Sequence, residues 1–446
     1  MSRDWLQTTL GNACSRITDG AHQSPKSAVV GKPMASVKDL TFFGVNLADA
    51  RRISEADFNA LVSQGCRPEI GDVLIAKDGN SALDTVCIQR EAADFVLLSS
   101  VAILRPDRSI IDSRYLAYVL RNPPYIEYLK ANFISGAAIP RVVLRDFKRA
   151  KLILPPLPEQ RAIAATLGAL DDKIELNRKM NATLEAMARA LFRDWFVDFG
   201  PTQRKAAGST DPATILGHFL PNTSQAPALA ASFPDCRGAD GLPAGWKLSA
   251  IGDVAKNHSE TMDLKKRHRV IFINTGDVSQ GAFLHANYSD AKGLPGQAKK
   301  KIEVGDILYS EIRPKNKRFA FVDFSAPDHV VSTKFMVLRT TSTVSPMHLY
   351  FLVSSPEAVD EFNRIAESRS GTFPQITFES IKHYPVILAN DEVMKAFSEI
   401  LELFYGLQRA NDQENQTLAQ TRDLLLPRLI SGELRVADLS DREIAA

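Results

Sequence analysis

Apolar residues recur every three or four positions along a stretch that begins near Leu154 and ends near Phe199. They stand at Ile163, Leu167, Leu170, Ile174, Leu184, Ala188, Leu191 and Trp195. An average step of 3.5 residues keeps one narrow apolar stripe facing a neighbouring helix, as in a coiled coil. At 1.5 Å per residue such a helix is about 60 Å long. The pattern therefore predicts a long helix that needs a partner.

A second apolar pattern of the same kind supplies a candidate partner. It runs through Val393, Phe397, Ile400, Phe404, Leu407, Asn411, Leu418 and Leu425. Packed antiparallel, each helix buries the apolar stripe of the other; the second helix is expected to end near Leu426, because Pro427 cannot continue it. The alternative is that each helix lies on its own domain. Amides in a helix seam fix its register, and we predict this role for Asn177, Asn181 and Asn411.

Several sequence features occur twice, in the same order. Gly71-Asp72-Val73-Leu74, which is typical of a turn and a buried strand, returns as Gly305-Asp306-Ile307-Leu308, 234 positions later. The loop Ser135–Arg141 has a counterpart at Ser370–Gln375. A repeat of this length is too long for a solenoid and indicates a tandem of two whole modules.

Short β-like runs mix with helical patterns inside each module, which indicates an α+β fold with an internal two-fold repeat. We expect two globular domains separated by two long antiparallel coiled-coil helices. A linker is expected between the first helix and the second domain, because Ala, Pro, Gly, Ser and Thr dominate there with little apolar period. The predicted segments are a first domain at 1–153, a helix at 154–199, the linker at 200–242, a second domain at 243–388, a helix at 389–436 and a tail at 437–446.

Charge is nearly balanced over the whole chain, with a formal net charge of +2, so the protein is not a generally basic coat for nucleic acid. Residues 260–340 are an exception, with fourteen Lys and Arg against nine Asp and Glu. The basic runs in this segment are Lys265–Arg269, Lys299–Lys301 and Arg313–Arg318. Such runs form a binding surface only if the fold gathers them on one side.

The chain contains no run of eighteen apolar residues and starts without an apolar signal segment, so we expect a cytoplasmic protein with no membrane span. Four scattered cysteines, without a CxxC pair, favour reduced and packed thiols. The histidines show no metal-ligand spacing, and we expect no metal site.

Asn122-Pro123-Pro124-Tyr125 is one motif with a possible catalytic meaning, because amino-methyltransferases use this tetrapeptide to hold the amine of adenine. Those enzymes also carry a glycine-rich cofactor loop, and no G-x-G occurs in this chain. The motif follows a helix-like run, so we interpret it as a helix-breaking turn. Phosphate-loop, HExxH and GxSxG motifs are also missing, and we expect no catalytic residues.

The junction Pro155–Arg161 (PPLPEQR), the helix end Phe192–Phe199 (FRDWFVDF) and the ending Leu425–Val436 (LLPRLISGELRV) resemble the specificity subunits of type I restriction–modification systems. The resemblance extends to the order and duplication of nearly the whole chain. It departs at Ala389–Glu392, where the second module lacks a PPLPEQ sequence.

The resemblance implies two target recognition domains, each of which reads one half of a split sequence in double-stranded DNA. It implies that the long helices separate the half-sites and dock modification (methyltransferase) subunits, which would bind S-adenosylmethionine. A restriction subunit would supply translocation and cleavage with ATP and Mg²⁺. This chain itself would be non-catalytic and without a cofactor. Two other functions stay open: a stand-alone adenine methyltransferase, and a coiled-coil scaffold without a role on DNA.

Two glycine-containing loops are our first candidates for DNA contact, because small residues let the backbone approach phosphate while Arg and Gln reach phosphates or base edges. The alternative is that these loops only turn the chain. Basic and amide residues that follow the Gly-Asp strand of each module are the next candidates. The complete predicted set is Lys77, Asn80, Ser135, Gly136, Arg141, Lys315, Lys317, Arg318, Arg369, Ser370, Gly371, Thr372 and Gln375.

Overall fold

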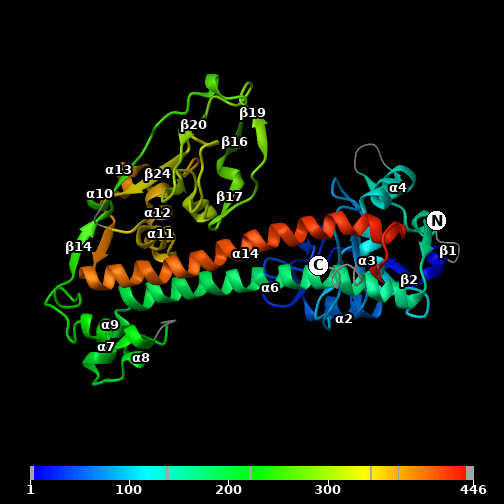
Figure 1. The fold of residues 1–446 in the computed structure, drawn as a ribbon, viewed down its shortest axis with the longest axis horizontal. Helices are drawn as coiled ribbons and strands as arrows, with labels where there is room; N and C mark the ends of the chain where they lie inside the picture. The colour runs from blue at the N-terminus through cyan, green and yellow to red at the C-terminus, as the bar shows by residue number, and fades with distance from the viewer. Residues whose placement is uncertain (1–4, 136–139, 220–222, 342–343, 370, 438–446) are drawn as a thin grey trace. The chain divides into compact units, whose positions relative to one another are not determined.

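A computed structural model describes residues 5–135, 140–219, 223–341, 344–369 and 371–437. The chain divides into two compact units, which are described separately below: unit 1 contains residues 1–179 and 410–446, and unit 2 contains residues 180–409. Two long helices, α6 (Leu157–Phe196) and α14 (Asp391–Ser431), each contribute residues to both units (Figure 1). The predicted long helices are therefore present.

Unit 1 is built on a four-stranded sheet of order β2-β10-β7-β8 and a three-stranded sheet of order β6-β3-β9. Strand β1 pairs with β13, β4 with β5, and β11 with β12. Its strands are β1 (Leu6–Thr9), β2 (Cys14–Asp19), β3 (Lys32–Ala35), β4 (Leu40–Thr41), β5 (Gly44–Val45), β6 (Arg51–Ile53), β7 (Val73–Ala76), β8 (Val86–Ile88), β9 (Val96–Leu97), β10 (Val101–Pro106), β11 (Ile134–Ser135), β12 (Arg141–Val142) and β13 (Lys151–Leu154). Its shorter helices are α1 (Leu10–Ala13), η1 (Val37–Asp39), α2 (Glu55–Ser63), α3 (Ser113–Arg121), α4 (Pro123–Phe133) and α5 (Leu144–Phe147).

The core of unit 1 lies between the four-stranded sheet and α3. All four residues of β7 are buried, as a strand covered on both faces requires. Asp112 caps α3 by accepting hydrogen bonds from the backbone N–H groups of Arg114 and Tyr115, and residues 115–120 of this helix are buried. This packing holds the end of β7 in place, and that end leads into the turn that contains Lys77 and Asn80.

Unit 2 repeats this architecture. A four-stranded sheet of order β15-β24-β21-β22 matches β2-β10-β7-β8, and the sheet β19-β16-β23-β20 contains a parallel pair, β16 with β23, that matches β3 with β9. Its strands are β14 (Lys247–Ala250), β15 (Ala255–Asn257), β16 (Arg269–Ile273), β17 (Val278–Ser279), β18 (Ala282–Phe283), β19 (Tyr288–Asp290), β20 (Ala298–Lys301), β21 (Ile307–Ser310), β22 (Phe319–Phe321), β23 (His329–Ser332), β24 (Phe335–Thr340) and β25 (Pro385–Leu388). Its shorter helices are α7 (Gly200–Ala206), α8 (Pro212–Ile215), η2 (Thr223–Gln225), α9 (Ala226–Ser232), α10 (Ile251–Val254), η3 (Leu264–Lys266), η4 (Thr275–Asp277), η5 (Pro314–Asn316), α11 (Pro346–Val353), α12 (Pro356–Arg369) and α13 (Phe378–Ile381). The internal two-fold repeat and the mixed α+β class are confirmed.

Helices α6 and α14 pack antiparallel within each unit. In unit 1 the buried Asn177 donates from Nδ2 to Glu414 Oε2 at 2.7 Å and to Asn415 Oδ1 at 3.1 Å. In unit 2 the Gln408 amide donates to the backbone oxygen of Asn181 at 3.0 Å. Two of the predicted register residues therefore bond across the pair, and Asn411 lies half-buried on α14.

The predicted apolar stripe of α14 needs two corrections. The helix does not end at Leu426 but continues through Pro427 to Ser431. Proline removes one helical hydrogen bond, and the burial of Leu426 and Leu429 on either side of it offsets that loss. Leu407, a predicted member of the stripe, is 52% exposed.

The predicted linker 200–242 is also corrected, because most of it is folded. Helices α7, α8 and α9 form in this segment, and Leu216, Leu229 and Phe233 are buried. Phe233 meets Trp195 of α6 edge to face, with ring centroids 5.0 Å apart. The segment contributes to the core of unit 2 through a few buried side chains, which its overall composition does not reveal.

Three general expectations can be compared with the described residues. None of the described helices is long and apolar enough to cross a membrane. The described residues contain no group of three or more His, Cys, Asp and Glu arranged to hold a metal ion. The four cysteines are unbonded to one another, and burial raises the pKa of the Cys14 and Cys87 thiols to about 12.

Candidate nucleic-acid interface

The first glycine loop of unit 1 is anchored to the turn that follows β7. The backbone N–H of Gly79 donates to the Pro140 oxygen at 2.9 Å, and the N–H of Val142 donates to the Lys77 oxygen at 2.9 Å. Gly79 has a φ of +90°, a conformation that glycine adopts without the steric cost of a Cβ. The ends of the loop are therefore held by β-type pairing to a rigid strand.

Three predicted contact residues of unit 1 share this surface. Arg141 is exposed, and its Nε lies 3.2 Å from Asp78 Oδ1. Ser135, across the hairpin from Arg141, and Asn80, in the turn, are exposed as well. The structure thus brings Asn80, Ser135 and Arg141 together, while the predicted residue Gly136 lies outside the described residues.

Lys77 was a predicted DNA contact, but the structure contradicts an exposed role for it. Its side chain is 7% exposed, and Nζ lies 3.1 Å from Asp19 Oδ2 and 3.6 Å from Asp78 Oδ1. The buried ammonium group pairs with two carboxylates and so stabilises the turn from the inner side. The equivalent position in unit 2 is Glu311, whose backbone oxygen accepts from Ile376 as the oxygen of Lys77 accepts from Val142.

The second glycine loop, in unit 2, is anchored in the same way. The backbone N–H of Arg313 donates to the Pro374 oxygen at 3.0 Å, and the N–H of Ile376 donates to the Glu311 oxygen at 2.9 Å. Gly371 and Thr372 are exposed and Gln375 is half-buried. The predicted residue Ser370 lies outside the described residues.

A short helix, η5, presents the basic residues beside this loop. Arg313 before it and Lys317 after it both adopt the left-handed conformation, with φ of +45° and +52°. Left-handed backbone costs roughly 1–2 kcal/mol for a residue with a Cβ. The turn is retained because the Lys317 backbone oxygen accepts a hydrogen bond from the Gln280 N–H at 2.8 Å. Exposed cations held in strained backbone are typical of functional surfaces.

The remaining predicted residues of unit 2 lie around η5 and the end of α12. Lys315 Nζ is 3.8 Å from Glu367 Oε1, and Arg369 donates to Thr377 Oγ1 at 3.3 Å. Arg318 is half-buried and donates to Thr275 Oγ1 at 3.5 Å. Lys315, Lys317 and Arg369 are therefore available at the surface, and Arg318 is partly engaged inside its own unit.

Two residues of this surface were missed. Asp78 holds Arg141 in place, and Arg313 occupies in unit 2 the position of Gly79 in unit 1. Arg313 belongs to a basic run, but its place beside the loop depends on an unusual positive φ. No local sequence pattern predicts an arginine in that conformation.

The Asn122–Tyr125 tetrapeptide forms the corner between α3 and α4, as interpreted from the sequence. Asn122 ends α3, and Pro123 occupies the first turn of α4, where its missing N–H costs nothing. The backbone N–H of Tyr125 donates to the Asn122 oxygen at 2.9 Å. The motif has a clear structural role.

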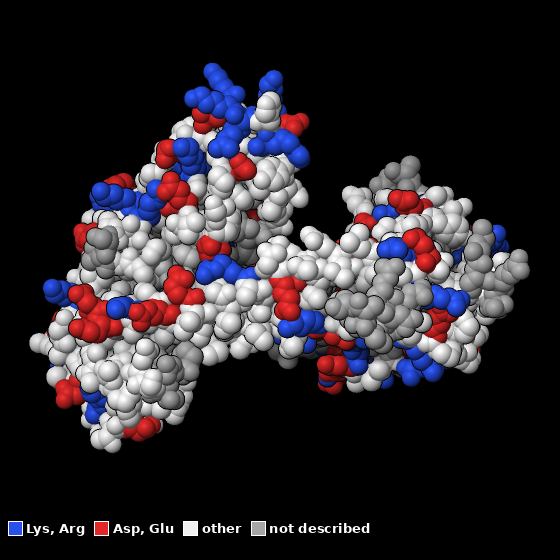
Figure 2. Space-filling view, in the orientation of Figure 1, with Lys and Arg blue, Asp and Glu red and all other residues white. Residues whose placement is uncertain are grey.

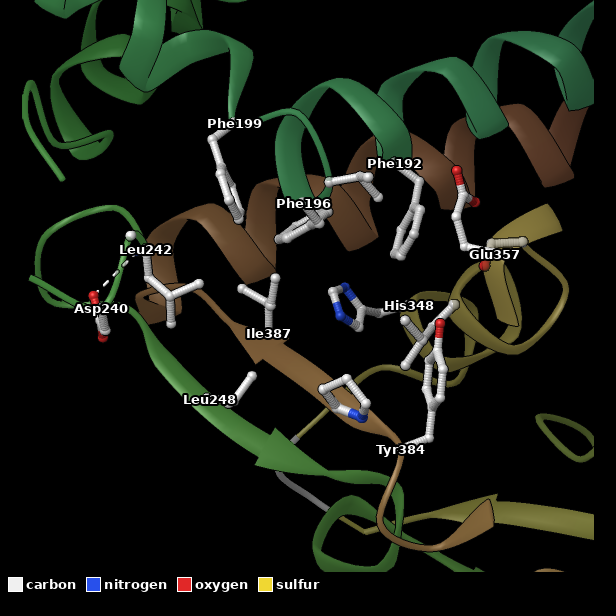
Figure 3. A pocket seen from close by; sticks show the side chains of 15 residues that line it. Phe192, Phe196, Phe199, Asp240, Leu242, Leu248, His348, Glu357, Tyr384 and Ile387 are labelled. Carbon is white, nitrogen blue, oxygen red and sulfur yellow. Dashed lines mark hydrogen bonds between the residues drawn. The ribbon is translucent and has the colours of Figure 1, made fainter. Parts of the chain in front are cut away.

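Unit 2 also contains an apolar hollow of about 540 Å³ at the end of α6 (Figure 3). Phe192, Phe196 and Ile387 line it together with His348 of α11, whose ring meets Phe196 edge to face at 4.5 Å. Burial lowers the pKa of His348 to about 4, so the imidazole is neutral at physiological pH. No lysine or arginine among the described residues lines this hollow, in contrast to the surface beside the glycine loops.

Comparisons with known proteins identify the family of this chain. Residues 56–186 and 243–420 match the family described as "Type I restriction modification DNA specificity domain". The two matches cover more than half of the chain and fall in the two modules. This chain belongs to the type I DNA specificity family.

Individual members of the family are similar over different lengths. The HindI specificity subunit of Haemophilus influenzae is 46% identical over 181 residues, which cover 40% of this chain and only 39% of that relative. The MjaIX specificity subunit of Methanocaldococcus jannaschii is 22% identical over 335 residues, which cover 73% of this chain and 70% of the relative. The crystal structure of the S subunit from M. genitalium matches with a TM-score of 0.50 over 96% of both chains, at 15% identity. That likeness supports the fold.

Proposed function

We propose that this chain reads a split DNA sequence for a type I restriction–modification complex, with each globular domain reading one half-site. The observation that carries the proposal is the repeated loop anchor. In each unit, two backbone hydrogen bonds join a glycine loop to the turn after a buried strand, at Gly79 and Arg313 respectively. Two copies of one recognition geometry suit a target made of two parts.

The exposed side chains at these loops have the chemistry for DNA. A guanidinium group donates two parallel hydrogen bonds to a phosphate or to the edge of a guanine, and an amide does the same with adenine. Arg141 supplies the first group in unit 1, and Arg369 with Gln375 supplies both in unit 2. Lys317 adds a charge that contacts phosphate without sequence preference.

The partners follow from the same proposal. Helices α6 and α14 separate the two half-sites and dock modification subunits, which carry the S-adenosylmethionine site. A restriction subunit with ATP and Mg²⁺ adds translocation and cleavage. The chain itself contributes selectivity and no catalytic group, and it acts in the cytoplasm, where its DNA target is found.

Methylation mapping tests the proposal directly. A host genome is sequenced for methylated adenines with the chain present, deleted, or carrying residues 243–388 of a relative with a different target. The expected result is a two-part motif that disappears on deletion and changes in only one half on exchange. A motif that changes in both halves, or persists without the chain, would overturn the proposal.

Two rival functions predict different results. A stand-alone methyltransferase based on Asn122–Tyr125 would bind S-adenosylmethionine as a purified chain, and calorimetry would detect that binding. A scaffold without a DNA role would leave DNA unbound even when modification subunits are present. We expect neither outcome.

A further inference from the structure

Lys and Arg side chains gather over the end of unit 2 at which β19 and β20 lie (Figure 2). This basic end comprises exposed residues from three separate segments of the chain, none of them in the glycine loop. Its members are Lys265, Lys266, Arg267, Arg269, Lys292 and Lys299.

A small hydrophobic cluster holds the three segments together. Val270, Ala291 and Ala298 are buried in one cluster with Met262 and Val330. Each basic segment adjoins a member of this cluster, and two backbone bonds join the segments directly: Ala291 N–H to the His268 oxygen at 2.9 Å, and Met262 N–H to the Lys299 oxygen at 2.8 Å. The fold therefore gathers two of the basic runs on one surface.

Part of this charge is neutralised within unit 2. Arg267 lies 2.8 Å from Asp328 and Lys266 lies 3.5 Å from Asp263. No carboxylate among the described residues lies within ion-pair distance of the ammonium groups of three exposed lysines. These are Lys265, Lys292 and Lys299.

An arginine beside these lysines contacts an aromatic neighbour. Arg269 donates from Nη2 to the Tyr288 backbone oxygen at 3.1 Å, and its guanidinium lies 5.6 Å from the centre of the Tyr288 ring. The Tyr288 ring is itself partly exposed. Asp290 faces Arg269 across the β16–β19 pair without forming an ion pair. The surface thus combines exposed lysines with one arginine positioned by Tyr288.

The matching region of unit 1 lacks this surface. Among the described residues, the sheet β6-β3-β9 has no fourth strand that corresponds to the lysine strand β20. Helix α2, with Glu55 and Asp57 in its first turn, ends just before the equivalent positions 64–67. Lys32 pairs with Asp94 at 2.7 Å, and Arg52 donates to the Gly31 oxygen. Residues 26–106 contain nine Lys and Arg against ten Asp and Glu, whereas the equivalent residues 260–340 contain fourteen against nine.

We propose that the basic end of unit 2 binds DNA phosphates beside the second half-site, so that the second module supplies most of the salt-dependent affinity. This inference rests on the proposed function, because it assigns unequal energetic roles to the two reading modules. Each phosphate neutralised by a lysine releases condensed counterions, which makes binding weaken steeply with salt. Base contacts at the glycine loops then decide which sequence is held.

Two charge-matched triple variants separate the modules. K265Q/K292Q/K299Q removes the three unpaired lysines of the basic end, and K26Q/K38Q/K151Q removes three exposed lysines of unit 1. Each variant is assembled with its modification subunits. Binding is measured by fluorescence anisotropy between about 50 and 200 mM salt, on a duplex carrying the mapped target and on a scrambled duplex.

The slope of log K against log salt is expected to become shallower by about 2–3 for the unit 2 variant and by less than about 1 for the unit 1 variant. Preference for the mapped target over the scrambled duplex should persist in both. Equal slope changes in the two variants, or an unchanged slope in the unit 2 variant, would overturn the inference while leaving the proposed function standing. A wild-type complex without preference for the mapped target would instead refute the proposed function.

Discussion

Arg105 donates two parallel hydrogen bonds to the buried carboxylate of Asp72, Nε to Oδ1 and Nη2 to Oδ2, each 2.9 Å long. The same arrangement recurs 234 residues later, where Arg339 binds Asp306 at 2.7 and 2.8 Å. In both units the carboxylate also accepts the backbone N–H three residues before it. In unit 1 the pair joins the end of β10 to the turn before β7, and in unit 2 it joins the end of β24 to the turn before β21. It therefore fixes the strand that precedes the turn to which each glycine loop is hydrogen-bonded.

Removing the carboxylate should destabilise the unit that contains it. Asp306 is fully buried, so Asp306→Asn loses two charge-assisted hydrogen bonds and leaves the Arg339 guanidinium with weaker partners. The expected loss in unfolding free energy is about 3 kcal/mol. Denaturant unfolding followed by the fluorescence of Trp195 and Trp246, which both lie in unit 2, measures it. Asp290→Asn, an exposed carboxylate of the same unit, is the control and should change stability by less than about 0.5 kcal/mol. Equal stabilities of the two variants would contradict the prediction.

Substitutions at Lys317 should separate its contact role from its backbone cost. Lys317→Gly and Lys317→Ala both remove the ammonium group, and each should make the salt slope of DNA binding shallower by about 0.9. Because the native φ is +52°, the glycine variant should be more stable than the alanine variant by about 1 kcal/mol. Anisotropy titrations and chemical unfolding measure the two effects.

A control variant tests whether position matters at Lys317. Lys256→Ala removes an exposed lysine on β15, away from η5, and should leave the salt slope unchanged. Replacing Lys317 and Arg318 together should weaken binding further. An unchanged slope in that double variant would refute the placement of DNA at η5.

Stability of unit 2 should fall in mild acid because of His348. Its pKa is lowered from 6.5 to about 4 by burial, so below pH 6.5 the unfolded chain takes up a proton that the folded chain does not. Stability is therefore lost as pH falls from about 6.5 to 4, by up to about 3 kcal/mol in total. His348→Gln cannot titrate and should lose this part of the pH dependence. Parallel curves for wild type and variant would show that another group is responsible.

The two long helices should set the spacing between the half-sites. Lengthening α6 and α14 by one helical turn each adds about 5.4 Å, and duplex DNA rises about 3.4 Å per base pair. The non-specific spacer in the methylated motif should therefore grow by one or two base pairs. Genome methylation mapping reads the spacer directly. If the extended protein methylates the original spacer, the helices do not act as a ruler.

Local patterns predicted a large part of this architecture. The four-three spacing of apolar residues identified both long helices, because a helix must bury one stripe whatever its partner is. The repeated Gly-Asp motif identified equivalent strands. In each unit a glycine with positive φ, Gly71 or Gly305, forms the turn before the strand, and a buried aspartate follows it. The two glycine loops occupy equivalent positions in the two units, as the repeat predicts, and their role in DNA contact stays a prediction.

Other predictions failed where the outcome depended on residues distant in sequence. Lys77 follows a strand as an exposed cation would, but Asp19, far away in the chain, buries and neutralises it. Pro427 should end a helix, yet α14 continues to Ser431, because the burial of Leu426 and Leu429 offsets the hydrogen bond that the proline removes. The 200–242 segment has the composition of a linker, but Trp195 gives its few large side chains a core to join.

The sequence by itself determined the duplication, the two long helices and the family resemblance. Each of these follows from the spacing of apolar residues or from the order of motifs along the chain. Only the tertiary structure decided which charges remain available. Basic runs at Lys265–Arg269 and Lys299–Lys301 become one surface because Val270 and Ala298 share a small core. Lys77, by contrast, is withdrawn from solvent, and its ammonium group pairs with Asp19. Charge acts through space and is screened or paired by what lies nearby, so its function is settled by folding rather than by sequence position.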